Sequence, residues 1–303
     1  MRAFITGISG FVGSHLAEYL ESAGAEVFGV ARAPVASAAG VVFTGDVLDT
    51  ASLREAVERS NPTHVFHCAG VLGGKDAKLL YETNVTGTSN LFTALDAARI
   101  KPIVVISGSS AVYERASVPI TEDQPTNPSN HYGKSKVEQE KVALAHFRST
   151  GWPVIRLRAF NLIGPRLSDS LAPGMLAKKV VTAERAGSQA IEAWDLDSRR
   201  DYTDVRDAVR AFAALAERGK AGEIYNVCSG VTRSVREILD RLIGLTGRTF
   251  VINEKIVNGS DEQVGSYDRL SALTGWQPAI DFGKSVIDLL NDWRSRNGEG
   301  KHP

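Results

Sequence analysis

Short apolar runs alternate with amphipathic stretches over the first half of the chain. The runs are four to six residues long, which is typical of buried strands, and they lie at residues 3–6, 26–31, 41–44, 64–69 and 103–106. Between them, apolar residues recur at helical spacing, as Val12, Leu16 and Leu20 do after the first run. Strands that alternate with helices predict a parallel sheet with helices on both faces.

The alternation becomes less regular beyond Gly164. Helical patterns cover residues 171–185 and 234–245, and residues 223–227 read as a strand that rejoins the sheet. Ser234 and Glu237 have the spacing of a capping box, as do Ser52 and Glu55 in the first half. We therefore predict an α/β fold: a Rossmann-like, doubly wound parallel sheet with a smaller C-terminal α/β domain.

Three glycines follow the first apolar run at regular spacing. Gly7 can adopt a positive φ, Gly10 allows the backbone to approach a pyrophosphate, and Gly13 allows close packing of helix on strand. The first helical turn, with Phe11 and Val12, then offers backbone N–H groups and the positive end of the helix dipole to the phosphates. The alternative is an ordinary turn with incidental glycines, but the flanking strand and helix favour a dinucleotide site.

The ends of the next strands indicate which dinucleotide binds. NAD enzymes usually place an acidic residue at the end of the second strand, whereas this chain has Ala31 and then Arg32. Arginine pairs well with a 2′-phosphate, so NADP(H) is preferred, NAD(H) stays possible, and a plain surface arginine is the alternative. Further cofactor contacts are predicted at Asp46, which is otherwise a turn residue, and at Val47, Ala69 and Gly70.

Composition narrows the classes of partner and location. The 35 basic residues equal the 35 acidic ones, which favours neither a nucleic-acid nor an anionic-membrane partner. No apolar run is long enough to span a bilayer. Cys68 and Cys228 both lie in apolar runs, which suits a reducing compartment, and we expect a cytoplasmic protein. His64 and His67 have no partner at ligand spacing, so no metal site is predicted.

The fifth strand leads into a segment rich in hydroxyl groups. In an open parallel sheet ligands bind beyond the carboxyl ends of the strands, so Ser109 and Ser110 are expected to face the ligand crevice. Tyr132 and Lys136 follow at i, i+4 spacing, which places phenol and ammonium on one helical face. A nearby positive charge lowers a phenol pKa and would make Tyr132 a general acid or base. The alternative is a solvated helix face.

These residues resemble the extended short-chain dehydrogenase/reductase family, with similarity nearly end to end. The motifs that carry the resemblance are Gly7-x-x-Gly10-x-x-Gly13, Ser109, Tyr132-x-x-x-Lys136, and the stretches 158–165, 200–202 and 274–278. Within the family, residues 197–207 and 226–230 are especially similar to the GDP-4-keto-6-deoxymannose reductases.

The resemblance also implies roles for single residues. Ser109 would bind the reacting oxygen of a nucleotide sugar, Tyr132 would transfer its proton, and Lys136 would hold the nicotinamide ribose. Ser110, Asn161 and Arg200 are the further substrate-binding predictions, with surface pairing to an aspartate as the alternative for Arg200. Residues 1–161 would bind the cofactor, with 200–230 partly returning to them, and 162–303 would mainly bind the nucleotide sugar.

The leading hypothesis is an NADPH-dependent reductase of an NDP-4-keto-6-deoxyhexose, most similar to those that act on GDP-4-keto-6-deoxymannose. The alternatives are an NDP-sugar 4-epimerase with tightly bound NAD and, more distantly, a non-catalytic NADP-sensing protein. A 4,6-dehydratase is disfavoured because Ser110, and no acidic residue, follows Ser109. Segment 252–265 lacks the arginine that many relatives use for phosphate. By resemblance we expect a homodimer formed through the helices that contain Asn84 and Tyr132.

Overall fold

Seven strands pair side by side in one parallel sheet. The computed structural model describes residues 1–303 except 36–38, 73–75, 115, 117, 258–260 and 297–303. Across the sheet the order is β10-β6-β5-β4-β1-β2-β3, which is the Rossmann arrangement with one added strand. The strands are β1 (Arg2–Thr6), β2 (Glu26–Ala31), β3 (Val41–Thr44), β4 (His64–His67), β5 (Ile103–Ser109), β6 (Val154–Ala159) and β10 (Ile224–Val227).

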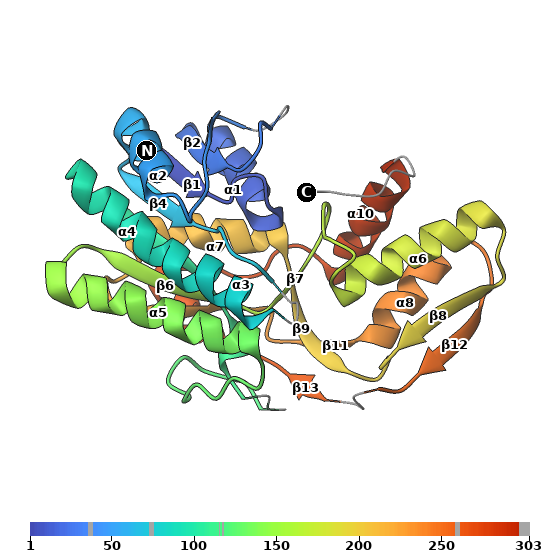
Figure 1. Ribbon diagram of the computed structural model, residues 1–303. Coiled ribbons are helices and arrows are strands. Elements are labelled where there is room, and N and C mark those ends of the chain that lie inside the picture. The colour runs from blue at the N-terminus through green and yellow to red at the C-terminus, as the bar shows by residue number, and fades with distance from the viewer. Residues whose placement is uncertain (36–38, 73–75, 115, 117, 258–260, 297–303) are drawn as a thin grey trace.

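Helices cover both faces of this sheet, because successive side chains of each strand point to opposite faces. Ile5, Phe66 and Val105 lie in one buried cluster, whereas their neighbours Phe4 and Val65 lie in another. The first cluster is covered by α1 (Phe11–Ser22), α7 (Val205–Arg218) and α9 (Asp268–Thr274). The second is covered by α2 (Thr50–Ser60), α4 (Gly87–Ala98) and α5 (His131–Thr150). The predicted doubly wound α/β fold is confirmed (Figure 1).

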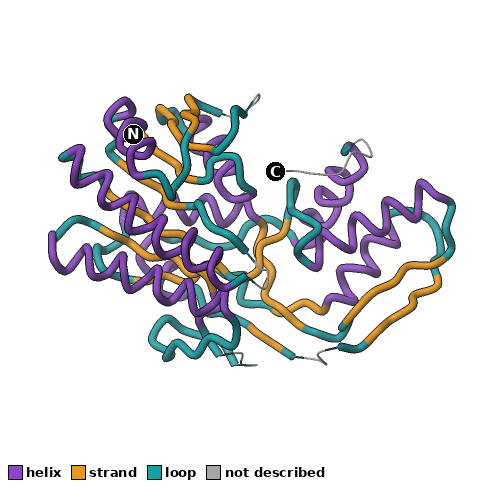
Figure 2. The backbone as a smooth tube through the Cα atoms, viewed as in Figure 1, coloured by secondary structure: helices purple, strands orange, loops and turns teal. Residues whose placement is uncertain are grey.

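The second half of the chain adds a smaller part with its own apolar core. Three helices pack there on two small sheets (Figure 2). The helices are α6 (Ala172–Ala186), α8 (Val235–Gly244) and α10 (Phe282–Ser295). The sheets comprise β7 (Asn161–Ile163), β9 (Arg199–Asp204), β11 (Thr232–Ser234) and β13 (Glu262–Gln263), and the pair β8 (Ala190–Trp194) and β12 (Val251–Lys255).

Some element boundaries differ from the predictions. β4 ends at His67 rather than residue 69, and β5 continues through Ser109 rather than ending at residue 106. The Ser52–Glu55 capping box is wrong, because Asp49 caps α2 by accepting a hydrogen bond from the Ala51 N–H. The capping box formed by Ser234 and Glu237 at the start of α8 is confirmed.

The chain crosses between the two parts more than once. β10 pairs with β6 at the edge of the large sheet, as predicted for residues 223–227. Leu270 of α9 and Trp276 also pack in the core of the large part. The division at residue 161 into cofactor and substrate domains stays a prediction, and residues 268–276 belong by packing to the first part.

Candidate active site

The loop between β1 and α1 has the shape of a phosphate cradle. Gly7 has a φ of +71°, as its predicted role requires, and a Cβ at Gly13 would lie 2.1 Å from the Gly7 carbonyl oxygen. Gly10 is the N-cap of α1, and no side chain caps this end. The first turn, which begins at Phe11 and Val12, therefore presents backbone N–H groups that suit a pyrophosphate.

The other predicted cofactor residues follow the carboxyl ends of neighbouring strands. Arg32 follows β2 and is exposed, Asp46 and Val47 follow β3, and Ala69 and Gly70 follow β4. Because these strands are adjacent to β1 or to each other and parallel, all these residues lie at the edge that carries the glycine loop. One Asp46 oxygen, Oδ1, accepts a hydrogen bond from the Leu48 N–H at 2.9 Å, so its turn role is present. The cofactor roles of these residues stay predictions.

Ser109 and Tyr132 meet at the same edge. Ser109 is the last residue of β5, and Tyr132 lies in the first turn of α5, which Asn130 caps by accepting from the Gly133 N–H at 2.8 Å. The Ser109 side chain lies close enough to the Tyr132 hydroxyl to influence its pKa. One turn further along α5, the Lys136 Nζ lies 6.0 Å from the centre of the Tyr132 ring. The three predicted catalytic residues are thus brought together.

Burial dominates the electrostatics of these groups. It raises the pKa of Tyr132, and the nearby Ser109 side chain, which favours the ionised form, only partly offsets this. The expectation that Lys136 lowers the pKa of Tyr132 below its ordinary value is therefore wrong for this structure. Burial likewise lowers the pKa of Lys136 to about 8, against the opposing influence of Glu140 and Cys68. At neutral pH the site thus holds a protonated tyrosine beside a lysine that is largely charged.

The predicted substrate residues have protein partners. The Ser110 hydroxyl is buried and donates to Gln263 Oε1 at 3.4 Å. Arg200 forms an ion pair of 2.5 Å with Asp261, so the alternative role of Arg200, pairing with an aspartate, is present in the structure. Asn161 donates to the Asp201 carbonyl oxygen at 3.5 Å. The roles of these residues toward a substrate stay predictions.

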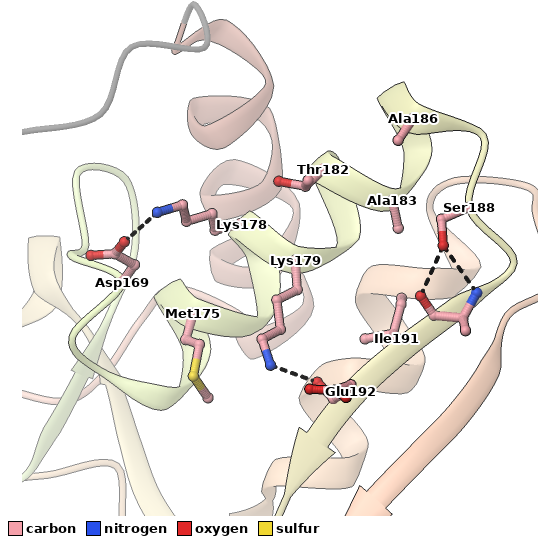
Figure 3. Close-up of a pocket in the computed structure, with 11 residues that line it drawn as sticks. Asp169, Met175, Lys178, Lys179, Thr182, Ala183, Ala186, Ser188, Ile191 and Glu192 are labelled. Atoms are coloured by element: carbon pink, nitrogen blue, oxygen red, sulfur yellow. Dashed lines mark hydrogen bonds and ion pairs between the residues drawn. The ribbon is translucent and has the colours of Figure 1, made fainter.

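Two cavities lie away from this edge. One, of about 440 Å³, runs between α6 and β8, where Lys178 pairs with Asp169 and Lys179 donates to the Glu192 carbonyl oxygen (Figure 3). The other, of about 850 Å³, lies between α1, α7 and the loop that contains Arg166. None of the predicted site residues lines either of them.

Two buried polar residues near Tyr132 and Lys136 were not predicted. Asn84 lies in a π-helical segment, η1 (Glu82–Thr86), and its amide joins the loop after β4 to Ser135 of α5. Gln139 of α5 is fully buried and accepts a hydrogen bond from the Lys136 Nζ at 2.7 Å. The available signal for Asn84 was a run of polar residues inside a helix, where such residues compete with backbone bonding. Gln139 offered no such signal.

Comparisons with known proteins agree with this geometry. The GDP-6-deoxy-D-mannose reductase of Pseudomonas aeruginosa is 33% identical over 308 residues, which cover 97% of this chain and 98% of that protein. The structure of RMD from Pseudomonas aeruginosa complexed with NADPH superposes with a TM-score of 0.88 at 31% identity, covering 97% and 99% of the two chains.

Epimerases are similar as well. The UDP-glucose 4-epimerase of Rhizobium meliloti is 29% identical, with 86% of each chain covered. The structure of the UDP-glucose 4-epimerase of Thermus thermophilus in complex with NAD has a TM-score of 0.87 at 25% identity, covering 98% and 100% of the two chains. The family model described as "NAD dependent epimerase/dehydratase family" matches residues 3–228. The chain therefore belongs to the NAD dependent epimerase/dehydratase family, within the extended short-chain dehydrogenases/reductases.

Proposed function

We propose that the protein is an NADPH-dependent reductase that delivers a hydride to C4 of an NDP-4-keto-6-deoxyhexose, with GDP-4-keto-6-deoxymannose as the best-supported substrate. The observation that carries this proposal is the placement of Tyr132, in the first turn of α5, close to Ser109 at the end of β5 and to Lys136 one turn further along the helix. Burial raises the pKa of Tyr132, so this tyrosine holds its proton at neutral pH. Reduction of a ketone needs a proton donor at that place, whereas oxidation of an alcohol needs a base.

The residues of the chain would divide the work as follows. The bound cofactor would supply the hydride. Ser109 would orient the carbonyl oxygen, and the Tyr132 hydroxyl would transfer its proton to that oxygen as negative charge develops there. The Lys136 ammonium would stabilise the phenolate left on Tyr132, because an opposite charge nearby favours the ionised form.

The cofactor preference rests on the end of β2. Arg32 is exposed there, where a guanidinium can reach a 2′-phosphate, and no carboxylate occupies the position. The similar reductase structure is described with NADPH and the similar epimerase structure with NAD, so NADP(H) is preferred and NAD(H) is possible.

A 4-epimerase is the second candidate, because UDP-glucose 4-epimerases are similar to most of the chain both in sequence and in structure. Such an enzyme would use tightly held NAD, and Tyr132 would have to act first as a base. NAD released from the denatured, purified protein would favour this candidate.

The deciding experiment follows NADPH absorbance after mixing the protein with GDP-4-keto-6-deoxymannose, with NADH in parallel. We expect stoichiometric loss of NADPH. In Tyr132→Phe, kcat should fall about 10²- to 10⁴-fold, as is usual when a general acid is removed. Tyr81→Phe makes the same change at an exposed position and serves as the control. Near-full turnover by Tyr132→Phe would refute the mechanism.

We further propose a homodimer that forms through the helices that contain Asn84 (η1, which continues into α4) and Tyr132 (α5). Sedimentation at several protein concentrations would test it. Within the described residues, no helix is long and apolar enough to cross a membrane.

A further inference from the structure

A chain of hydrogen bonds runs from Lys136 into the interior of the sheet. The Lys136 Nζ donates to Gln139 Oε1 at 2.7 Å, and Gln139 Nε2 donates to Thr88 Oγ1 at 3.0 Å. Thr88 Oγ1 lies 2.8 Å from His67 Nε2, and His67 Nδ1 lies 2.7 Å from Thr6 Oγ1. The Thr6, His67, Thr88 and Gln139 side chains are fully buried. This series of hydrogen bonds thus connects α5, α4, β4 and β1, and it ends at Thr6, one residue before Gly7 of the phosphate cradle.

The direction of each bond in this chain follows from the donors available. Thr88 donates its single hydroxyl hydrogen to the Asn84 carbonyl oxygen at 2.7 Å, so its oxygen can only accept from its other neighbours. His67 must therefore carry its hydrogen on Nε2, and its bare Nδ1 accepts from Thr6. Burial lowers the pKa of His67 to about 3, which keeps the ring neutral as this pattern requires.

The hydrogen bonds of Thr88 also fix the orientation of the Gln139 amide. Its NH₂ group must face Thr88, because the Thr88 oxygen accepts only, and its carbonyl oxygen must then face Lys136. If the amide were flipped, two donors would meet at Lys136 and two acceptors at Thr88. Such unpaired buried groups cost about 1–3 kcal/mol each. Thr88 therefore selects the orientation that presents an acceptor to the lysine.

We propose that Gln139 is a positioning residue for Lys136, oriented by Thr88 and His67, and that it directs the ammonium group toward the cofactor. This inference rests on the proposed function for the role of Lys136 itself. Lys136 has three N–H donors, of which one goes to Gln139 and a second to the Ser107 carbonyl oxygen at 2.7 Å. A Cβ on Gly70 would lie 3.8 Å from Nζ, so the third donor is left near the predicted cofactor path.

The charged and titratable groups around Lys136 determine what a change at Gln139 should do. Glu140 and Tyr132 face it from its own helix, and His67 and Cys68 face it from the end of β4. His67 is neutral, and burial raises the pKa of Cys68 to about 12, so Glu140 is the charge that opposes the effect of burial on Lys136. The pKa of Lys136, about 8, should then respond directly to the acceptor at position 139.

The test compares two substitutions that should move this titration in opposite directions. Gln139→Leu removes the acceptor and should lower the pH at which Lys136 loses its charge. Gln139→Glu keeps an acceptor and adds a negative charge, so it should raise that pH. The basic limb of the pH profile of kcat for NADPH oxidation should shift in the same direction as the Lys136 titration. At pH 8, kcat of Gln139→Leu should be roughly 10- to 100-fold lower than that of the wild type. Gln189→Leu makes the same change at an exposed position.

Substitutions at Thr88 test the orienting step without touching Gln139. Thr88→Val removes the acceptor that holds the amide and should shift the basic limb in the same direction as Gln139→Leu. Thr88→Ser restores a hydroxyl and should bring the wild-type limb back, which a mere loss of packing would not do. Circular dichroism and thermal melting of each variant establish that it is folded.

A measurement on the cofactor-free protein separates this inference from the proposed function. The ¹⁵N resonance of Lys136 Nζ is titrated in the wild type and the two Gln139 variants, and ¹⁵N-labelled histidine reports the His67 tautomer. We expect opposite shifts for the two variants and a bare Nδ1 on His67 between pH 5 and 8. Equal titration in all three proteins, or a hydrogen on Nδ1, would overturn the inference. Failure to reduce any nucleotide sugar would instead count against the proposed function alone.

Discussion

A buried ion pair involves the helix that carries Tyr132 and Lys136. Glu140, one turn beyond Lys136 on α5, accepts two hydrogen bonds from Arg158 of β6, at 2.8 and 2.7 Å. The two side chains, Arg158 and Glu140, are 4% and 6% exposed. The Arg158 guanidinium also lies over the Tyr113 ring, 4.6 Å from its centre. Because the pair is buried, solvent cannot replace either partner, and removal of one should be strongly destabilising.

The perturbation is Glu140→Gln, which keeps the shape of the side chain and removes its charge. One amide oxygen replaces two carboxylate oxygens, so Arg158 loses its counter-ion and one of its two bonds to position 140. Removing one partner of a buried pair lowers the free energy of unfolding by about 3–5 kcal/mol, and because one acceptor is retained we expect a loss of about 3 kcal/mol for this variant. That is more than a 10²-fold change in the folding equilibrium, or a fall in Tm of about 5 °C for a chain of this length.

Urea unfolding followed by circular dichroism measures the loss. The control is Glu58→Gln, which breaks the exposed i,i+4 pair with Arg54 and should cost less than about 0.5 kcal/mol. The double substitution Glu140→Leu with Arg158→Met should recover much of the stability, because no unpaired charge remains buried. The reasoning would be refuted if Glu140→Gln lowered the free energy of unfolding by less than about 1 kcal/mol. It would also be refuted if the double variant lost as much stability as the two single substitutions, Glu140→Leu and Arg158→Met, lose in sum.

Three further predictions concern the cofactor edge and the buried histidine. Gly13→Ala would place a Cβ 2.1 Å from the Gly7 carbonyl oxygen and should raise the NADPH Kd at least about 10-fold in a fluorescence titration. Arg32→Ala should weaken NADPH about 10-fold and leave NADH within about twofold, whereas equal weakening would exclude a 2′-phosphate contact. His67 takes up its second ring proton near pH 6.5 in the unfolded chain but only near pH 3 in the folded one. The unfolded state therefore binds more protons between these pH values, and the free energy of unfolding should fall as the pH drops from 6.5 toward 3. His67→Asn should flatten that dependence in urea unfolding measured from pH 7 to 4.

Most of the large sheet could be predicted because its strands are apolar and locally distinct. The end of β5 could not, since Ser107 to Ser109 have no strand pattern, and they are extended because their backbone pairs with Leu157 to Ala159 of β6. The start of α2 was misread for a related reason. Ser52 and Glu55 match the capping pattern, but Asp49 lies earlier in the chain and caps the helix by accepting from the Ala51 N–H.

The predictable part of the site consists of residues whose chemistry is evident in the sequence. Gly7 has the positive φ and Gly13 the close backbone approach predicted for them, and Tyr132 and Lys136 lie on one helical face. Gln139 was not predictable, because a glutamine between Glu138 and Glu140 reads as part of an exposed surface. Only the packing of α4 and β4 against α5 shows that it is buried.

The position of β10 at the edge of the large sheet bears on how the protein is synthesised. The ribosome completes β6 by residue 159, but the strand that covers its open edge ends at Val227, and Trp276 closes the same core. Until then, a nascent chain presents unpaired strand backbone, which is a template for aggregation. A shortened product that ends at residue 161 would lack β10 and the α7 and α9 side chains that complete one face of the sheet, so we expect it to aggregate rather than to fold as an independent unit.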